Sequence, residues 1–380
     1  MNYVYFFCLL SCATLLGACA TETQVLVEDP RVEDVIELVE ANVVPSLHRR
    51  PKAVLVGERR LTTRADRAVI AEMQSSLPTL TPEVRQALLA QRDLLQRQRA
   101  SKVYEIDGLE LRKRDFIKVI DKLLTGSFMT DPLDGVSVSY GEPVKFTGYY
   151  SPEVTVSKKR TARFRYPILS YPKGYEGRLP SRRAIELEGV LNTKALALAW
   201  AEHPLDVYML QLQGSGFVRF QDGSRRYLAY AGTNRYPYQS IELAVARRDS
   251  SFQDLSMRNL RSWINEQPRV RDSITCFNPN YGFFKLSDGA ARGAAGLPLQ
   301  PMISVAADPE FYPLGSVLLA KVPVPGTQSE FTTQLLLVQD TGGAVKGSRH
   351  LDLYTGVGES ALDLAEVSAS YGEVYLLSPR

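Results

Sequence analysis

A single acidic residue, Asp352, lies inside a segment that otherwise has the composition of a buried strand. Its neighbours are Leu351, Leu353 and Tyr354, and at the position of Asp352 itself Val, Ile or Thr would be expected. An ionised carboxylate is costly to bury without a partner, so such a residue either accepts hydrogen bonds or keeps its proton. A carboxylic acid that stays protonated near neutral pH suits general-acid catalysis. The residue types leave two interpretations open: an Asp held by backbone N–H groups at a strand end, and a catalytic acid.

Two further aspartates precede Asp352, each close to a predicted strand. Asp340 follows the apolar run Leu335–Val338 at a turn that reads DTGG, and Asp308 follows the predicted strand Pro298–Ala306. Ordinary glycosidases use a pair of carboxylates, one as acid and one as nucleophile or base. The number of acids therefore does not exclude a hydrolase.

Hydroxyl, amide and aromatic side chains recur beside glycines in three short segments. The first reads FTGYYSP and contains Thr147, Tyr149 and Tyr150. Tyrosines present flat apolar faces with polar ends, which suits sugar rings, although tyrosines in a predicted strand also suit core packing. The other two segments place polar groups and bare backbone N–H where ligands commonly bind. They are QGSGF, with Gln213, Gly214 and Ser215, and YAGTN, with Tyr230 and Asn234.

These segments occur in one order from Phe146 to the C-terminus, together with GRLPS, NPNYGFF, DTGGAVKG, HLDLY and YGEVYL. In that order they resemble the membrane-bound lytic murein transglycosylase A family, with its three-aspartate domain. Leu351 stands where the family usually has Phe. The resemblance implies that Asp352 is the catalytic acid and that Asp340 and Asp308 support the site. It also implies that one groove is lined by Thr147, Tyr149, Tyr150, Gln213, Gly214, Ser215, Tyr230 and Asn234.

The resemblance further implies a mainly β fold with bracing helices. A double-psi β-barrel would be the catalytic domain, and an inserted second β-barrel-like domain would form the other wall of a substrate groove. We expect the following division: 1–18 signal peptide, 19–60 lipidated N-terminus and tether, 61–152 helices and first part of the barrel, 153–276 inserted domain, and 277–380 second part of the barrel.

Local patterns predict several helices and strands. Thr81-Pro82-Glu83 is a helix start, and we expect a helix to about Lys102. A second amphipathic pattern ends at Gly126. The remaining predictions are helices over 111–124, 193–201, 240–246 and 255–265, and strands over 163–171, 206–212 and 315–320.

The bulk properties exclude several classes of protein. The chain has 380 residues, for which two domains are expected, and a net charge of +3, which is too small to indicate a nucleic-acid partner. Zinc spacings, a P-loop, a dinucleotide fingerprint and a Gly-x-Ser-x-Gly elbow are missing from the sequence. We therefore expect no metal, no cofactor and no nucleic acid.

The N-terminus has the pattern of an exported lipoprotein. Residues 4–18 form an apolar run too short to span a bilayer comfortably, which indicates a signal peptide. It ends in Leu-Gly-Ala before Cys19, which resembles the lipobox of bacterial lipoproteins. That resemblance implies lipidation of Cys19, and Ala20 after it implies an outer-membrane anchor facing the periplasm.

The family resemblance also implies a reaction. Asp352 would protonate the oxygen between N-acetylmuramic acid and N-acetylglucosamine in peptidoglycan glycan strands, and its conjugate base would then take the proton of the muramic acid C6 hydroxyl. A 1,6-anhydro ring closes, and other cell-wall enzymes are possible partners. Two alternatives stay open: a murein hydrolase, and a non-catalytic, expansin-like peptidoglycan-binding lipoprotein.

Overall fold

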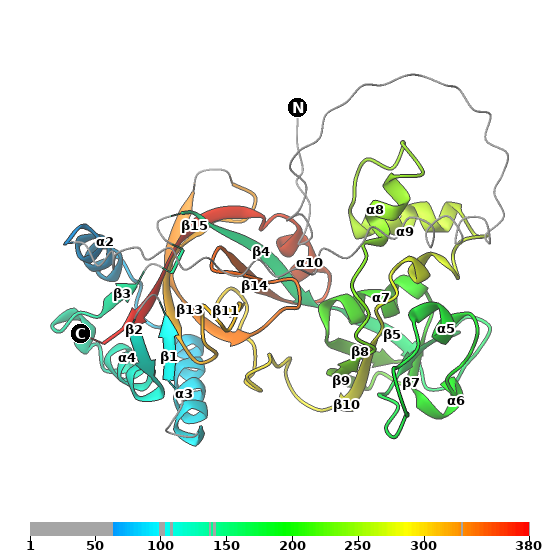
Figure 1. The fold of residues 1–380 in the computed structure, drawn as a ribbon, viewed down its shortest axis with the longest axis horizontal. Coiled ribbons are helices and arrows are strands. Elements are labelled where there is room, and N and C mark those ends of the chain that lie inside the picture. Colours follow the sequence, from blue (N-terminus) through cyan, green and yellow to red (C-terminus); the bar gives the residue numbers. More distant parts are fainter. Residues whose placement is uncertain are drawn as a thin grey trace.

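The computed structural model describes residues 64–98, 103–106, 109–136, 138–139, 142–327 and 330–379. The predicted signal peptide, Cys19 and the tether lie outside these residues. Two sheets dominate the described part of the chain, and they lie side by side along the long axis of the molecule in Figure 1.

The first sheet has seven strands in the order β12-β13-β11-β14-β4-β15-β3. Because β12 also pairs with β15, six of these strands close into a barrel, and β3 extends from β15. Closure leaves those strands without a free edge. The strands are β3 (Asp134–Val136), β4 (Val144–Ser151), β11 (Ser304–Ala306), β12 (Val317–Pro323), β13 (Phe331–Asp340), β14 (His350–Val357) and β15 (Ser370–Ser378).

Continuous apolar runs form the barrel strands because helices cover much of the outside. Leu335 to Val338 are all buried, as the sequence pattern predicts. Two helices pack against the barrel, α3 (Pro82–Arg97) and α4 (Lys113–Thr125), together with α2 (Arg64–Ser75) beside β3. A two-stranded sheet and a short 3-10 helix complete this region: β1 (Val103–Ile106), β2 (Leu109–Arg112) and η1 (Ser127–Met129).

The N-terminal helices begin and end where capping chemistry places them. Thr81 accepts a hydrogen bond from the N–H of Val84, and Pro82 is the first residue of α3, as predicted. The helix ends at Arg97, earlier than the predicted Lys102. The helix expected from residue 111 begins at Lys113, because Leu111 belongs to β2 and pairs with Tyr104.

Helix α10 (Glu359–Glu366) packs directly on strand β4 at Gly148. A Cβ atom at Gly148 would lie 2.7 Å from the Cα of Ala365, closer than real contacts allow. The glycine of the FTGYY segment therefore serves helix packing here.

The second sheet has six strands in the order β10-β9-β8-β5-β7-β6, and an isolated bridge between Ser170 and Phe284 joins its two edges. It is consequently close to a second barrel. Pairing of β10 with β9 carries this sheet to Ser287, past the expected boundary at residue 276. Its strands are β5 (Glu153–Ser157), β6 (Tyr166–Leu169), β7 (Ala197–Ala201), β8 (Gly216–Phe220), β9 (Arg225–Thr233) and β10 (Gly282–Ser287).

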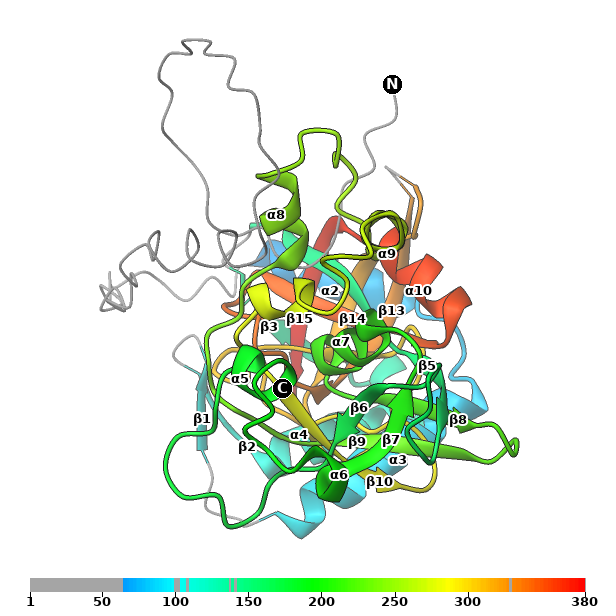
Figure 2. The same ribbon diagram turned by 90° about the vertical axis from the view of Figure 1, so that its right-hand side faces the viewer.

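Helices surround this sheet, and Figure 2 shows α5 to α9 from the side of the sheet facing away from the barrel. They are α5 (Arg182–Glu186), α6 (Thr193–Leu196), α7 (Pro204–Gln213), α8 (Ile241–Ala246), α9 (Met257–Glu266) and the 3-10 helix η2 (Ile274–Phe277). The predictions for 240–246 and 255–265 are confirmed as α8 and α9.

Three predicted elements are wrong in part or whole, two in this half of the molecule and one in the barrel. The strand expected over 206–212 is helix α7. His203 caps its start, Pro204 is its first residue, and Gly214 ends it at a φ of 78°, so turn signals outweigh the apolar composition. The helix expected over 193–201 stops at Leu196, where β7 begins, and the strand expected over 298–306 covers only the last three of those residues. The mainly β architecture with bracing helices and barrel-shaped sheets is confirmed.

Candidate active site at the junction of the two sheets

The parallel pairing of β4 with β14 sets Thr147 directly beside Asp352. The Thr147 hydroxyl donates to Oδ1 of Asp352 at 2.7 Å. Both side chains are almost fully buried, with 7% of Asp352 exposed. Strand register, set by the apolar residues on either side, therefore brings the FTGYY and HLDLY segments together although they are about two hundred positions apart in the chain.

His350 extends this contact. Its Nε2 atom lies 2.9 Å from Oγ1 of Thr147. Burial of the half-buried imidazole, together with the positive charge of Lys145, lowers the pKa of His350 to about 4. His350 is therefore neutral at neutral pH. The sequence shows His350 next to the predicted acid but does not indicate this contact, because it depends on the pairing of two distant strands.

Tyr149 and Asp340 form a second contact close by. The Tyr149 hydroxyl donates to Oδ2 of Asp340 at 2.9 Å. Burial raises the pKa of Tyr149 well above its usual value, and the negative charges of Asp340 and then Asp352 raise it further. Tyr149 thus lies within electrostatic reach of both carboxylates.

Asp340 also holds the segment that connects the two sheets. Its Oδ1 accepts hydrogen bonds from the backbone N–H of Ala294 and of Thr341, both at 2.8 Å. Burial raises the pKa of Asp340, and these donors together with Tyr149 oppose the rise. One carboxylate therefore links strand β4, the end of β13 and the connection after β10.

Asp308 ties two turns together at one end of the barrel. Its side chain accepts from the N–H of Glu310 at 3.1 Å and from the N–H of Gly347 at 2.9 Å. Gly347 lies in the turn between β13 and β14, just before His350. Asp308 therefore contacts the loop that precedes His350, and its supporting role in the site stays a prediction.

An aromatic cluster joins the two sheets beside these residues. Tyr149 packs on Tyr354 with ring centroids 5.3 Å apart. Phe217 from β8 and Tyr227 from β9 belong to the same cluster. The face of the second sheet that carries β8 and β9 therefore lies against the Tyr149 side of the barrel.

The predicted QGSGF residues reach the same junction. Oε1 of Gln213 accepts from the N–H of Tyr150 at 3.3 Å. Gly214 and Ser215 follow Gln213 and are partly buried, and Tyr230 on β9 is 55% exposed. Tyr150 itself is buried and packs with Met209 and Ala361, so its ring fills the contact between the two halves.

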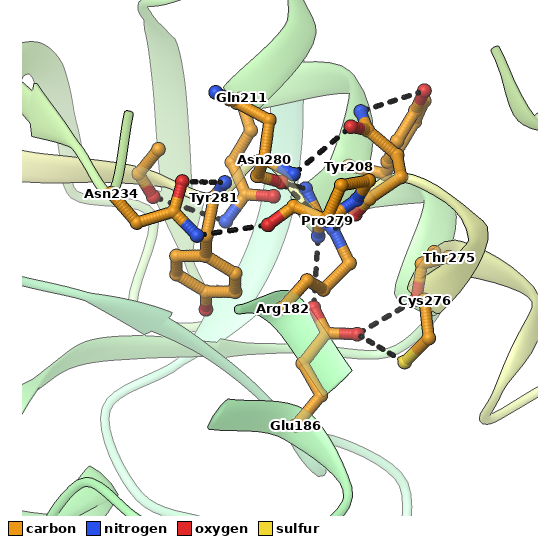
Figure 3. Close-up of polar contacts among 12 residues, drawn as sticks. Arg182, Glu186, Tyr208, Gln211, Asn234, Thr275, Cys276, Pro279, Asn280 and Tyr281 are labelled. Atoms are coloured by element: carbon orange, nitrogen blue, oxygen red, sulfur yellow. Dashed lines mark hydrogen bonds and ion pairs between the residues drawn. The ribbon is translucent and has the colours of Figure 1, made fainter. Parts of the chain in front are cut away.

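Asn234 lies apart from this group, inside the second half of the molecule. Its Nδ2 donates to the carbonyls of Pro180 at 2.9 Å and Pro279 at 2.8 Å, and its Oδ1 accepts from the N–H of Tyr281 at 2.9 Å. Only 2% of Asn234 is exposed. Figure 3 shows it pointing into the backbone around Pro279 and Tyr281. The structure thus places it among loop backbone groups.

Arg182, which the sequence patterns do not indicate, is the centre of the same network. It is 1% exposed, donates to the carbonyls of Asn278 and Asn280, and pairs with Glu186 at 2.9 Å. Its guanidinium also lies over the rings of Tyr208 and Tyr281 (Figure 3). The motifs GRLPS, YAGTN and NPNYGFF therefore converge on one buried arginine and one buried asparagine.

The part of the chain that the structure describes contains neither a metal-binding cluster of side chains nor a membrane-spanning helix. Among the ranges listed above, side chains of His, Cys, Asp and Glu do not gather in groups of three or more that could hold a metal ion. Within the same ranges, every helix is too short or too polar to cross a membrane.

Comparisons with known proteins cover both sheets. Residues 145–285 match the family model described as the MltA specific insert domain, and residues 303–378 match the 3D domain. The chain is 37% identical to membrane-bound lytic murein transglycosylase A of Vibrio cholerae over 62% of its own length and 65% of the relative's. It is 30% identical to the homolog of Buchnera aphidicola over 70% of its own length and 74% of the relative's.

The solved structures give the same result. The crystal structure of E. coli MltA with bound chitohexaose superposes with a TM-score of 0.64 at 28% identity, covering 80% of this chain and 92% of that one. The sequence match itself spans just under two thirds of the Vibrio relative's length.

Proposed function

The chain belongs to the membrane-bound lytic murein transglycosylase A family, and from that premise we propose that it is a lytic transglycosylase of peptidoglycan. The observation that carries this proposal is the position of Asp352 in the barrel. Its carboxyl group is buried, accepts from the hydroxyl of Thr147, and lies within electrostatic reach of Tyr149. Asp352 is the carboxyl group best suited to exchange a proton with a substrate.

The proposed reaction needs one carboxyl group. Protonated Asp352 gives its proton to the oxygen that links C1 of N-acetylmuramic acid to N-acetylglucosamine. The C1–O bond breaks, and its electron pair stays on that oxygen as the new hydroxyl of N-acetylglucosamine. The C6 hydroxyl oxygen of the same muramic acid bonds to C1, and its proton returns to Asp352. Water does not enter, and the acid is regenerated.

We propose that the glycan strand lies in a groove at the junction of the two sheets. Support comes from the aromatic cluster there and from the bound chitohexaose of the E. coli relative. Tyr149, Gln213, Gly214, Ser215 and Tyr230 are the proposed contacts, while Thr147, Tyr150 and Asn234 act through the groups they hold. We also propose that the six-stranded sheet, from residue 153 to the end of β10, is an insertion into the barrel domain.

The proposed location is the periplasmic face of the outer membrane, with Cys19 as the lipidated N-terminus. The names of the relatives describe them as membrane-bound, which supports this proposal. Replacing Cys19 by Ala should release an active protein from membranes, because the site residues lie far downstream. A Cys19→Ala protein that still incorporates fatty acid would contradict it.

Product analysis tests the proposed activity directly. Purified murein is digested with the full-length protein, and the released muropeptides are separated and identified by mass. Fragments ending in 1,6-anhydromuramic acid are the expected products. Reducing ends would indicate a hydrolase, and binding to murein without release would indicate a non-catalytic module.

A further inference from the structure

Three polar side chains form a continuous line on one face of the barrel wall, between strands β4 and β14. Nε2 of His350 lies 2.9 Å from Oγ1 of Thr147, and that hydroxyl lies 2.7 Å from Oδ1 of Asp352. His350 and Asp352 are two residues apart on β14, so both point to the same face, and Thr147 reaches them from β4. Of these three residues, only Asp352 takes part in the proposed reaction.

Counting hydrogens fixes the direction of the line when Asp352 is ionised. An ionised carboxylate can only accept, so the hydroxyl of Thr147 donates its one proton to Asp352. It can then only accept from His350, so the hydrogen between these two residues belongs to Nε2. A neutral imidazole carries a single N–H, and the chain of bonds therefore requires the Nε2-protonated tautomer.

The surroundings keep the imidazole in that neutral form. His350 is half-buried, and Lys145 faces it from β4. Burial and this positive charge both disfavour the imidazolium, so the pKa of His350 is about 4. In the neutral form only one ring nitrogen carries a proton, so the tautomer decides whether His350 donates to Thr147 or accepts from it.

We propose that His350 is a positioning residue that acts through Thr147 to make Oδ1 of Asp352 a hydrogen-bond acceptor. This rests on the proposed function of Asp352. With Oδ1 accepting from Thr147, the acid carries its transferable proton on Oδ2. The opposite tautomer of His350 would accept from Thr147, and Thr147 would then accept the proton of Asp352 and hold it inside the protein.

This arrangement of hydrogen bonds affects both steps of the reaction, the proton transfer from Asp352 and the proton transfer back to it. In the first half, the proton leaves from one defined oxygen toward the glycosidic oxygen. In the second half, the Thr147 hydroxyl stabilises the carboxylate that takes the proton of the C6 hydroxyl. The direction of the line stays the same in both halves, so the protein does not need to reorganise between them.

The tautomer is measurable without any assay of activity. The chain has three histidines, His48, His203 and His350, so 15N spectra of the imidazoles in the full-length protein are assigned with a His350→Gln variant. At pH 7 we expect His350 to be protonated on Nε2 and not on Nδ1. A His350 protonated on Nδ1 would overturn the proposal, whatever the protein does to murein.

Kinetics with isosteric variants test the role in catalysis. Thr147→Val keeps the shape and removes the hydroxyl, while Thr147→Ser keeps the hydroxyl. We expect kcat for anhydromuropeptide release to fall about 10- to 100-fold in Thr147→Val with KM little changed, because a hydrogen bond to a charged group is lost. Thr147→Ser should recover most of that loss. Equal kcat values for the two variants would overturn the proposal.

The histidine is tested in the same way. His350→Ala should lower kcat about 10-fold, and His350→Gln, which keeps an N–H donor, should recover part of the loss. A fall in His350→Ala that appears only in KM or in thermal stability would contradict a role through Thr147. If the wild-type protein releases no anhydromuropeptides, the proposed function fails, and the 15N measurement still decides the direction of the hydrogen-bond line.

Discussion

Two buried polar clusters of this molecule are built in opposite ways. In the barrel, Thr147, His350 and Asp352 contact one another through side chains. In the second half, Arg182 and Asn234 direct most of their hydrogen bonds at backbone carbonyl and N–H groups. Both clusters consist of residues from segments that resemble the same family, yet the two central residues of the second, an arginine and an asparagine, do not change protonation during a reaction.

The two clusters differ in whether their central residues can change protonation, and this difference separates catalytic from structural roles. Arg182 stays charged at any working pH, and the amide of Asn234 does not titrate, so these two residues each have one state and fix loops. The first cluster contains a carboxyl group and an imidazole, which each have two states. We therefore expect changes in the barrel cluster to affect turnover, and changes in the second cluster to affect stability.

The largest expected effect is on turnover. Asp352→Asn should lower the rate of anhydromuropeptide release at least about 1,000-fold, because the amide has no transferable proton. Thr147 can still donate to the amide oxygen, so the free energy of unfolding should change by about 1 kcal/mol or less. Release of products within a few-fold of the wild-type rate would remove Asp352 from the proposed role.

The next effect is on stability. Arg182→Met should reduce the free energy of unfolding by about 3–5 kcal/mol, since it leaves Glu186 and two backbone carbonyls without their buried partner. Denaturant unfolding measures this change. Arg183→Met is the matched control, because Arg183 is partly exposed and pairs with the exposed Glu188. Equal unfolding curves for the two variants would show that burial of Arg182 is not what stabilises these loops.

One short segment, YAGTN, contains a buried structural residue, Asn234, and an exposed residue that we propose as a sugar contact, Tyr230. Asn234→Ala should cost about 2–3 kcal/mol of stability through unsatisfied backbone groups, with KM unchanged in the protein that remains folded. Tyr230→Ala should leave stability within about 0.5 kcal/mol, because the ring is largely exposed, and should weaken binding of a chitin oligosaccharide. If Asn234→Ala instead weakens binding at full stability, Asn234 belongs to the groove after all.

Sequence reasoning predicts the barrel better than the second half, for identifiable reasons. The run Leu335–Val338 and the segment around Asp352 are buried strands with few alternatives, so composition suffices. Residues 206–212 have a similar apolar composition, and there the caps His203 and Gly214 decide for helix α7. Tertiary pairing alone determines the rest: nothing near Arg182 in the sequence shows that it is buried, and nothing near His350 shows that Thr147 lies beside it.

The smallest expected effect concerns Asp340. Like Asp352 it is a carboxyl group that can ionise, and like Arg182 and Asn234 it makes hydrogen bonds to backbone groups. Asp340→Asn preserves the shape: the amide oxygen can accept from Ala294 and Thr341, and the amide nitrogen can donate to the oxygen of Tyr149. We therefore expect a change in turnover of only a few-fold, roughly 1 kcal/mol or less. Asp340→Ala, which removes the link to Ala294, should be the more damaging change.

The pH dependence of stability separates the two roles of Asp340. Burial raises the pKa of Asp340 in the folded protein, so ionisation of this group opposes folding. Its contribution to stability is complete below the pKa of an unfolded Asp, about 3.9, and is lost as the pH rises through the raised folded pKa. Asp340→Asn does not ionise, so its stability relative to wild type should increase across that window and stay constant above it. The free energies of unfolding of wild type and Asp340→Asn, measured from below about pH 3.9 to above neutral pH, give the difference. A relative stability that falls with pH would mean that the ionised carboxylate is the favoured form, and that its hydrogen bonds outweigh its burial.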